Sequence, residues 1–481
     1  MEQALTFLSN NLNLHKMKNI KIYILAFALL LSSTACEKYV SKDDFNPNQP
    51  TSSTLPTLLP TVEVAVFATY TGQISRTSGL WIQHFQGTDQ QMIDISRYEI
   101  TENGIQNDWN TIYASGIVNA KDIITKADAL GAPYYKGIAQ ICYAMLVGVA
   151  TDYWNDVPNT QAGLGVANLT PQYETQEAVI TSIQTMLSEA IGNLQTATSA
   201  NSVIPASDDL IHNGDRSLWI KAAYLLKARY SNRLSQRNAT TSATQALANL
   251  TAGGWSGNAD NTYARFSGAG NELNSWYAFE NQRGNYIKMN ATLVNKMIAK
   301  NDPRISFYCK PDNNGNFTGT PVDDYADIST SSIGNYFAGP DATTLPLLTF
   351  AEAKFIEAEA NLRLGQSAAA QTAFTEAITA AMDYPGIDAA AVSAYLTNYG
   401  TLSGSTADQL AQIMDEKYVA LFTQLEPYHD WRRTNLPVLN PATTGVQATI
   451  PVRFPTEQNE RLYNPNAVVV SNTTTRVWWD N

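Results

Sequence analysis

Apolar residues recur at helical spacing through much of this 481-residue chain. Residues 109–130 carry apolar side chains three or four positions apart, and the pattern ends at Gly131 and Pro133. This spacing predicts a helix with one buried face, which stops at the Gly and Pro residues. Residues 134–150 are apolar nearly all round, which predicts a second helix buried between neighbours. The two segments therefore predict an αα-hairpin.

The same pattern predicts further helices, separated by long segments without a period. One starts at Thr175, whose hydroxyl suits an N-cap, and another begins near Ser217. Other expected helices cover residues 61–85, 291–300, 350–364, 368–381 and 408–425. Loops are expected at 86–107, at 253–286 and at 309–348, the last with a turn or hairpin around 312–316. The chain is thus predicted to be all-α, with tetratricopeptide-like helix pairs, long irregular loops and few short strands.

The pair at 350–381 resembles a tetratricopeptide repeat in its second helix. Small and apolar residues stand where that repeat needs close packing: Gly365, Ala370, Phe374, Ala377 and Ile378. The first helix matches poorly, because Glu357 and Asn361 occupy positions that usually hold Leu and Tyr. Phe374 is expected to fill the space to the next helix pair. Such a scaffold favours a binding protein over an enzyme.

Residues 17–35 have the features of an export signal. Lys18 and Lys21 supply positive charge, the run 22–31 is apolar, and small residues precede Cys36. The apolar run is shorter than the ~20 residues that a transmembrane helix needs. We therefore expect Cys36 to be acylated, as in a bacterial lipoprotein; the alternative is a soluble secreted protein in which Cys36 is incidental.

The residues around this signal divide into three further parts. Residues 1–16 are polar and include Glu2, so we expect an upstream extension, with Met17 as the start. Residues 36–60 are polar and contain four prolines, which predicts a lipidated tether without helix. Residues 61–481 are expected to form one binding domain.

The net charge limits the kinds of partner that the protein can bind, and the cysteine content limits the number of disulfides that can stabilise it. The formal net charge of −12 would repel phosphates, so nucleic acid is not an expected partner. The chain has three cysteines, and with Cys36 acylated at most one disulfide remains. Stability is therefore expected to rest on packing.

Motifs for metal binding and nucleophilic catalysis are missing from the sequence. No two of the four histidines have metal-ligand spacing, and no Gly-x-Ser-x-Gly, His-Glu-x-x-His or phosphate loop occurs. Asp312 opens an Asp-x-Asn-x-Asn run like that of a calcium loop, but Phe317 stands where such a loop needs Gly. A solvated turn is the favoured interpretation.

Carboxylates for a glycosidase are harder to exclude. Glu416, Glu426 and Asp430 are the set nearest to a suitable pair, because Trp431 lies beside them. The favoured interpretation is structural, since Asp430 is close to Arg433 and an internal ion pair would tie this segment to the last helix.

Trp276 and Tyr277 are adjacent in a predicted loop that is rich in Asn and Arg. Aromatic faces stack on sugar rings or peptides, while Asn and Arg side chains hydrogen-bond to hydroxyls and amides. Asn274, Arg283 and Asn285 are the nearest polar candidates. This loop therefore predicts ligand contact, with core filling or a partner interface as the alternatives.

Several short runs follow the export signal in a characteristic order. They are residues 152–158 (DYWNDVP), 171–177 (PQYETQE), 301–304 (NDPR), 416–418 (EKY), 430–434 (DWRRT) and 451–455 (PVRFP), with Glu460 and Asn464. This set resembles the SusD/RagB-type outer-membrane lipoproteins of the Bacteroidetes over nearly the whole mature chain. The resemblance implies one α-helical domain on four tetratricopeptide-like helix pairs. It also implies capture of a glycan or peptide at the cell surface, as a lid over a SusC-like TonB-dependent transporter.

The resemblance leads us to expect a non-enzymatic nutrient-binding lipoprotein of the outer membrane, without cofactor or metal. Family ligands bind in variable loops, which points to segments 76–98 and 255–286. The expected ligand contacts are Trp276, Tyr277, Asn274, Arg283, Asn285, Trp81, Gln83 and Asp89. The anchor is expected to face the exterior, although the acidic run that often follows the lipidated cysteine is reduced to Glu37, Asp43 and Asp44. A surface glycosidase using Glu426 and an interaction scaffold without a small ligand are the alternatives.

Overall fold

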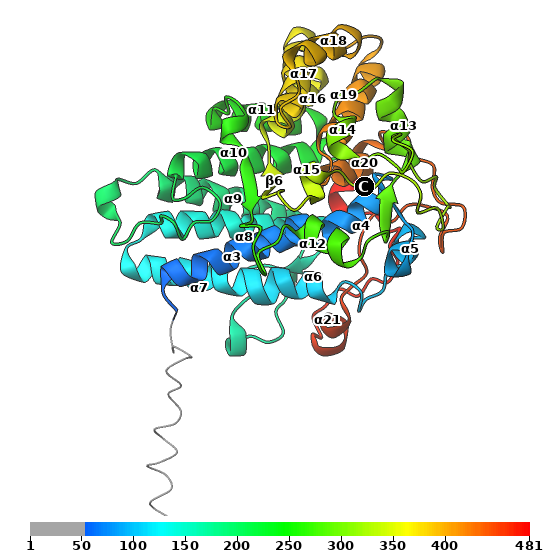
Figure 1. Cartoon of the computed structure of the whole chain (residues 1–481). Helices are drawn as coiled ribbons and strands as arrows, with labels where there is room; N and C mark the ends of the chain where they lie inside the picture. The colour runs from blue at the N-terminus through cyan, green and yellow to red at the C-terminus, as the bar shows by residue number, and fades with distance from the viewer. Residues whose placement is uncertain (1–52) are drawn as a thin grey trace, which may run out of the picture. The chain divides into compact units, whose positions relative to one another are not determined.

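The computed structural model describes residues 53–481, and α-helices dominate it (Figure 1). Its first half holds α3 (Leu55–Thr71), α4 (Gln73–Trp81), α5 (Gln90–Ser96), α6 (Gln106–Asn110), α7 (Val118–Leu130), α8 (Pro133–Trp154), α9 (Gln176–Leu194), α10 (Arg216–Arg233) and α11 (Ala239–Gly253). Its second half holds α12 (Ser275–Gln282), α13 (Ala291–Ala299), α14 (Ile305–Tyr308), α15 (Asn335–Ala338), α16 (Phe350–Arg363), α17 (Ser367–Asp383), α18 (Ala389–Tyr399), α19 (Thr406–Ala420), α20 (Glu426–Thr434) and α21 (Gln458–Tyr463). The predicted export signal and Cys36 lie outside the described residues.

Strands are short and form three antiparallel pairs in the described part of the chain. They are β1 (Phe85–Gly87) with β5 (Ile287–Met289), β2 (Val157–Pro158) with β3 (Tyr173–Glu174), and β4 (Thr262–Arg265) with β6 (Thr344–Leu348). The predicted all-α class with few short strands is confirmed. Residues 312–316 form a turn rather than a strand hairpin, closed by a hydrogen bond from the Asp312 N–H to the Asn316 carbonyl oxygen at 2.8 Å.

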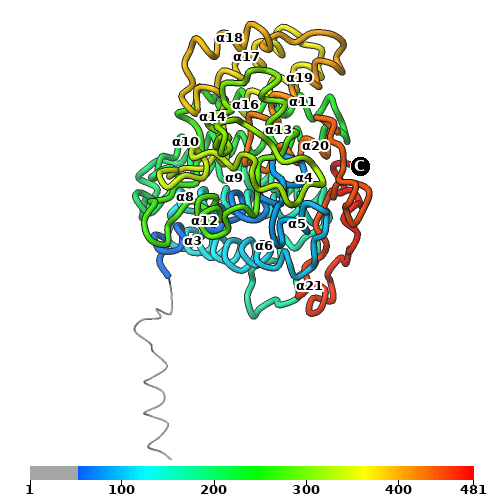
Figure 2. Tube along the Cα trace, turned by 45° about the vertical axis from the view of Figure 1, so that its right-hand side comes forward, coloured from blue at the N-terminus to red at the C-terminus, as the bar shows by residue number. Residues whose placement is uncertain are grey.

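Successive long helices pack against one another in chain order. The series runs α7, α8, α9, α10, α11, α16 and α17, each in contact with the next, and Figure 2 shows the same stack from a second side. The predicted αα-hairpin is α7 with α8, and α8 is buried on nearly every face, as expected. Gly148 of α8 permits a close crossing, because a Cβ there would lie 1.7 Å from Oη of Tyr230 in α10. The segment between α11 and α16 is an insertion that holds the irregular loops.

The helix pair α16–α17 matches the tetratricopeptide prediction. Ala370, Phe374 and Ala377 are fully buried. Phe374 lies in one buried cluster with Tyr395 of α18 and Ile413 of α19, so it fills the space to the next helix pair. Packing that was expected from the small-residue pattern is therefore present.

Some boundaries differ from the predictions. Helix α3 begins at Leu55, so the end of the predicted tether is helical; Pro56 lies in the first turn, where an N–H has no helical partner, and Pro60 is also accommodated. The expected helix 61–85 breaks at Gly72, where a Cβ would lie 2.2 Å from the Ala68 carbonyl oxygen. The expected helix 109–130 includes a π-helical turn at Thr111–Ile117. The expected helix 408–425 is α19, and a separate helix, α20, follows it.

Candidate functional site

The two loop segments singled out by the sequence meet at a small sheet. Strand β1 belongs to segment 76–98 and pairs with β5, which directly follows segment 255–286. Next to this sheet, the Thr88 N–H donates to the Tyr286 carbonyl oxygen at 2.9 Å, and Thr88 Oγ1 donates to the Asn285 carbonyl oxygen at 2.6 Å. Segments about 200 residues apart in the chain are therefore joined at one place.

The predicted platform residues Trp276 and Trp81 lie in the core. Both rings are fully buried. Trp276, in the first turns of α12, packs on Phe85 with ring centroids 4.8 Å apart. Trp81 packs on Tyr428, and its Nε1 donates to the Ile95 carbonyl oxygen at 3.2 Å. Neither ring offers a face to a ligand, which corrects the prediction for both residues; for Trp276 it agrees with the core-filling alternative.

Asn274 and Gln83 are likewise occupied inside the protein. Asn274 is the N-cap of α12, and its Oδ1 accepts from the Trp276 N–H at 2.8 Å. Its Nδ2 donates to one carbonyl oxygen in α15 and to one in the loop that follows α15. Gln83 Oε1 accepts from Thr292 Oγ1 at 2.7 Å, and both side chains, Asn274 and Gln83, are buried. These side-chain amides link neighbouring segments of the protein and are not available to a ligand, so the prediction that Asn274 and Gln83 contact a ligand is wrong.

The other four predicted contacts remain accessible. Arg283 and Asn285 are exposed, and Tyr277 and Asp89 are partly exposed. Asp89 also caps α5, because its Oδ1 accepts from the Gln90 N–H at 2.8 Å. Three of the four lie on α12 or just after its C-terminal end, close to the β1–β5 sheet. Their role in binding stays a prediction.

A hollow of about 570 Å³ lies at the N-terminal end of α12, between α3 and residues 265–275. Its apolar lining includes Phe67 and Phe266, whose ring centroids are 5.9 Å apart, with Val64 and Leu273. Arg265, Ser267, Asn271 and Glu272 supply polar groups. The volume is in the range of small-ligand pockets, and a mainly apolar lining with a few polar groups is typical of them.

The contribution of α3 to this hollow was not predicted. Val62 and Val66 are fully buried, whereas Val64 lies between them on the opposite side of the helix and is 52% exposed. The signal available in the sequence was Val64, an apolar residue on the solvent-facing side of the helix, where a polar residue is expected.

A second hollow, of about 560 Å³, meets the first at Leu210 and Arg265. It is more polar, with Asp209, His212, Asn258, Asn261 and Tyr263 among its lining residues. Burial lowers the pKa of His212 to about 4, so this imidazole is neutral at pH 7. Arg265 Nε donates to the Ile211 carbonyl oxygen at 3.1 Å, which fixes the guanidinium at the junction. The two hollows therefore adjoin near the end of β4, the first mainly apolar and the second more polar.

Charged groups of unusual pKa lie beside α12. The Arg76 guanidinium of α4 is 4.5 Å from the Phe279 ring centroid, and its Nε and Nη1 have no hydrogen-bond partner among the described residues. Burial lowers the pKa of Arg76 to about 10 and raises that of Asp108 to about 7. Burial also raises the pKa of Glu280 to about 7. Protonation near this helix therefore changes around neutral pH.

The carboxylates of the glycosidase alternative are fixed in buried ion pairs. Glu426 lies 2.9 Å from Arg233, and Glu416 lies 3.0 Å from Arg304. Asp430 pairs with Arg433 at 2.8 Å, as the structural interpretation expected, and also with Lys417 of α19 at 2.7 Å. Ion pairs of this kind leave these carboxylates no access to a substrate, which counts against the residues that the glycosidase alternative requires.

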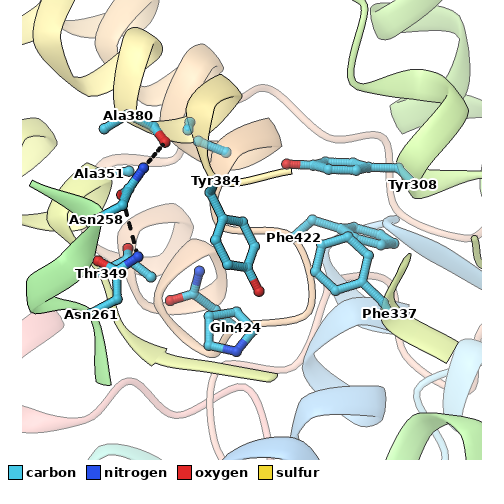
Figure 3. Close-up of a pocket in the computed structure, with 13 residues that line it drawn as sticks. Asn258, Asn261, Tyr308, Phe337, Thr349, Ala351, Ala380, Tyr384, Phe422 and Gln424 are labelled. Carbon is cyan, nitrogen blue, oxygen red and sulfur yellow. Dashed lines mark hydrogen bonds between the residues drawn. The ribbon is translucent and has the colours of Figure 1, made fainter. Parts of the chain in front are cut away.

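A further cavity, between the insertion and the later helices, is far too small for a nutrient. Its volume is about 10 Å³, which is room for one water molecule at most. Figure 3 shows Phe422 between Tyr308 and Phe337, with Gln424 beneath Tyr384. Tyr308 and Phe422 stack with centroids 4.8 Å apart, so this is an aromatic core.

Neither a metal site nor a membrane-spanning helix is found among the described residues. Residues 53–481 contain no group of three or more His, Cys, Asp or Glu side chains placed to hold a metal ion. Asp312 Oδ1 accepts from the backbone N–H groups of Asn314 and Asn316, which is the hydrogen bonding of a turn. Within the same residues, none of the helices combines the length and the apolar character needed to cross a bilayer.

The fold and the hollow define a helical protein with a recessed surface on an inserted segment. A SusD-like family model, described as "Starch-binding associating with outer membrane", matches residues 47–455, so the chain belongs to this SusD-like family. The predicted resemblance is thereby confirmed. No sequence among the curated proteins matches the chain significantly.

Solved structures of this family have the same fold. A SusD/RagB family protein from Bacteroides thetaiotaomicron is 24% identical, with 89% of this chain and 99% of that chain covered and a TM-score of 0.76. A chitin-binding SusD homologue from Flavobacterium johnsoniae is 20% identical, with 89% and 97% covered and a TM-score of 0.75. A SusD homologue from Bacteroides fragilis is 21% identical, with 89% and 100% covered and a TM-score of 0.76.

Proposed function

We propose that this chain is a lipid-anchored glycan-binding protein of the outer membrane that passes its ligand to a SusC-like transporter. The observation that carries the proposal is the hollow of about 570 Å³ beside α12. Family membership and the chitin-binding neighbour favour a glycan over a peptide as the ligand. Cys36 would carry the lipid, and the transporter would close the binding site from the other side.

The hollow has the chemistry that a sugar ring requires. The Phe266 ring, partly exposed and packed on Phe67, offers an apolar surface on which the C–H face of a sugar stacks. Arg265, Asn271 and Glu272 supply donors and acceptors for hydroxyls or acetamido groups at the rim. An acyl group on the sugar would contact the apolar lining of the first hollow. The polar hollow beyond Arg265 would offer room for the next sugar unit.

The other end of α12 adds a second set of contacts. Helix α12 has eight residues and is about 12 Å long. Tyr277, Arg283, Asn285 and Asp89, which stay accessible, would bind sugar units beyond the hollow. A chain of several sugars along α12 would thus contact both loop segments.

Calorimetric titration with N-acetylglucosamine oligosaccharides tests the proposal, with maltooligosaccharides as the second ligand series. Each stacked ring contributes roughly 0.5–1.5 kcal/mol, so Phe266→Ala should weaken binding by about two- to ten-fold. Leu130→Ala, on the exposed end of α7, is the control and should bind like the wild type. Failure of both series to bind, or unchanged affinity in Phe266→Ala, would refute the proposed site.

A second pair of variants distinguishes the contributions of the two ends of α12 to ligand binding. Arg283→Ala and Asn285→Ala should weaken binding of long oligosaccharides and leave binding of the disaccharide unchanged, because only a long ligand reaches from the hollow to that end. Equal losses for short and long ligands would show that the sugar binds first at the β1–β5 sheet.

A further inference from the structure

Exposed large apolar side chains gather in two short segments of the described chain. Leu164, Val166 and Leu169 lie in the loop that joins α8 to α9, and Leu462, Tyr463, Val468 and Val469 lie in α21 and the loop after it. Within these two segments, the most exposed side chains are Val166 at 96%, Leu169 at 76% and Tyr463 at 74%. We call these seven residues the apolar tips. Exposure of several large apolar side chains together marks an interaction surface.

The two segments that carry the apolar tips are held together. Asn466 Nδ2 donates to the Thr170 carbonyl oxygen at 2.8 Å, and Asn464 Nδ2 donates to the Pro171 carbonyl oxygen at 3.1 Å. Tyr173 Oη donates to Glu460 Oε2 at 3.0 Å. These bonds fix the bases of both loops, so the tips form one surface.

The two loops that carry the tips have no charged side chain although the whole protein is acidic; the charges next to them on α21 are Glu460, which accepts from Tyr173, and Arg461, which pairs with Glu102. Residues 157–173 and residues 462–475 contain no Asp, Glu, Lys or Arg, in a chain of net charge −12. A charged side chain is costly in a bilayer, whereas Leu and Val are favourable there and Tyr suits the boundary with water. The composition therefore fits a lipid surface that is entered to a shallow depth.

The start of α3 lies on the same side of the domain as the apolar tips, which favours the lipid bilayer as the occupant. Helix α3 starts at Leu55, and in Figures 1 and 2 its first turn, α21 and the loop between α8 and α9 all lie toward the lower edge of the domain. Residues 37–54 span at most about 60 Å between the proposed lipid on Cys36 and this helix. The bilayer that holds the anchor is thus within reach of the apolar tips.

We propose that the apolar tips insert into the headgroup region of the membrane that carries the anchor and set the orientation of the domain. The proposal rests on the membrane location in the proposed function, but not on the glycan site. The tether raises the local concentration and so strengthens a contact with lipid that the tips also make by themselves. The loop backbone stays at the interface, because unpaired peptide groups are not tolerated in hydrocarbon.

An environment-sensitive dye on residue 166 tests the contact. The chain from residue 36 onward, without the predicted export signal, carries Cys36→Ala and Val166→Cys and is labelled with a nitrobenzoxadiazole maleimide. Cys142 and Cys309 are buried, and burial raises the pKa of the Cys309 thiol to about 12, so neither competes. The matched control carries Val438→Cys instead, which is 81% exposed and lies beside a hollow lined by α13, α18 and α19, toward the upper edge of Figure 1. The probe is vesicles of phosphatidylethanolamine and phosphatidylglycerol.

Vesicles should brighten and blue-shift the dye at position 166 and leave the dye at position 438 unchanged. In the Cys36→Ala chain, Val166→Asp with Leu169→Asp should reduce cosedimentation with vesicles by about ten-fold, whereas Val438→Asp should not. A silent dye at position 166, or equal changes at both positions, would overturn the proposal. A silent dye together with cross-linking of position 166 to a membrane protein in cells would assign the surface to a protein partner instead. Glycan affinity is measured on the same variants and should stay at the wild-type value, so the two proposals fail separately.

Discussion

Arg233 of α10 donates to Glu426 of α20 through both terminal nitrogens, at 2.9 and 3.0 Å, in the core of the protein. The same arginine contacts Asp152 of α8 at 3.0 Å. Arg229, one turn earlier on α10, lies 3.4 Å from Glu426 and 2.7 Å from Glu352 of α16. One buried network of charges therefore joins α8, α10, α16 and α20.

Glu426→Gln should destabilise the fold strongly. The change removes one of the two counter-charges of both Arg233 and Arg229, which keep Asp152 and Glu352, and breaking a buried ion pair costs up to about 3–5 kcal/mol. Urea unfolding followed by circular dichroism measures the loss. Glu376→Gln, which breaks a half-exposed pair with Lys354, is the control and should change stability by less than about 1 kcal/mol. A variant of wild-type stability would show that the network is not stabilising.

Acid should weaken the fold through the same residue. Burial would raise the pKa of Glu426, but Arg233 and Arg229 outweigh it and lower the pKa from 4.5 to about 2. This stabilisation is therefore complete above pH 4.5 and is lost as the pH falls toward 2. The free energy of unfolding of Glu426→Gln should fall less over this range than that of the wild type. Parallel curves for the two proteins would contradict the assignment.

Glu280 makes the free energy of unfolding depend on pH with the opposite sign, near neutral pH. Burial raises the pKa of this residue from 4.5 to about 7, against the opposing effect of Lys310, Lys288 and Arg76. Its contribution is therefore fully present below pH 4.5 and is lost as the pH rises through 7. Glu280→Gln should reduce the loss of stability between pH 5 and pH 8, measured by thermal unfolding at each pH. A loss as large as that of the wild type would exclude this residue as a source.

Trp276→Ala should unfold or strongly destabilise the protein. The ring is fully buried against Phe85, and truncation of a buried Trp costs about 3–5 kcal/mol. Tyr277→Ala, the next residue on α12, is the matched control and should cost clearly less, because Tyr277 is partly exposed. A stable Trp276→Ala variant that loses glycan binding would restore Trp276 as a ligand contact.

Gly148→Ala should separate α8 from α10. The new Cβ would lie 1.7 Å from Tyr230 Oη and 2.5 Å from its Cζ, so the helices must move apart, at a cost of about 1–3 kcal/mol. Gly192→Ala in α9 has no atom within 4 Å of the added Cβ and should leave stability unchanged or raise it by up to about 1 kcal/mol. Chemical denaturation compares the two variants, and equal effects would argue against the close crossing.

Hydrophobic periodicity predicted the helices that pack along one face, among them α7, α8, α9 and α16. It missed α11 and α18, since both are rich in Ala and Ser or Thr and bury few large side chains. The expected helix 61–85 runs through Gly72, whereas in the structure α3 ends and α4 begins there. Periodicity thus misses helices that bury few large side chains, whereas α17, which is also rich in Ala, is predicted from its match to the tetratricopeptide repeat.

The site was harder to predict than the fold. The sequence identified both segments that meet at the β1–β5 sheet, but it could not show that residues 275–282 form a helix that turns Trp276 inward. The hollow joins α3 to residues 265–275, about 200 positions later in the chain, so local pattern contains no information about it. Ion pairs such as Arg233 with Glu426 are equally distant in sequence.

The path of α3 determines how the domain would resist a pull applied at Leu55. Helix α3 packs along α7, α8 and the π-helical turn between α6 and α7, with Leu59, Val62 and Val66 fully buried. Force applied along its axis at Leu55 would load these contacts in shear, all at once, rather than peel them one by one. A mechanical load at the N-terminal end of α3 would therefore enter the domain through its central packing and not through a peripheral loop.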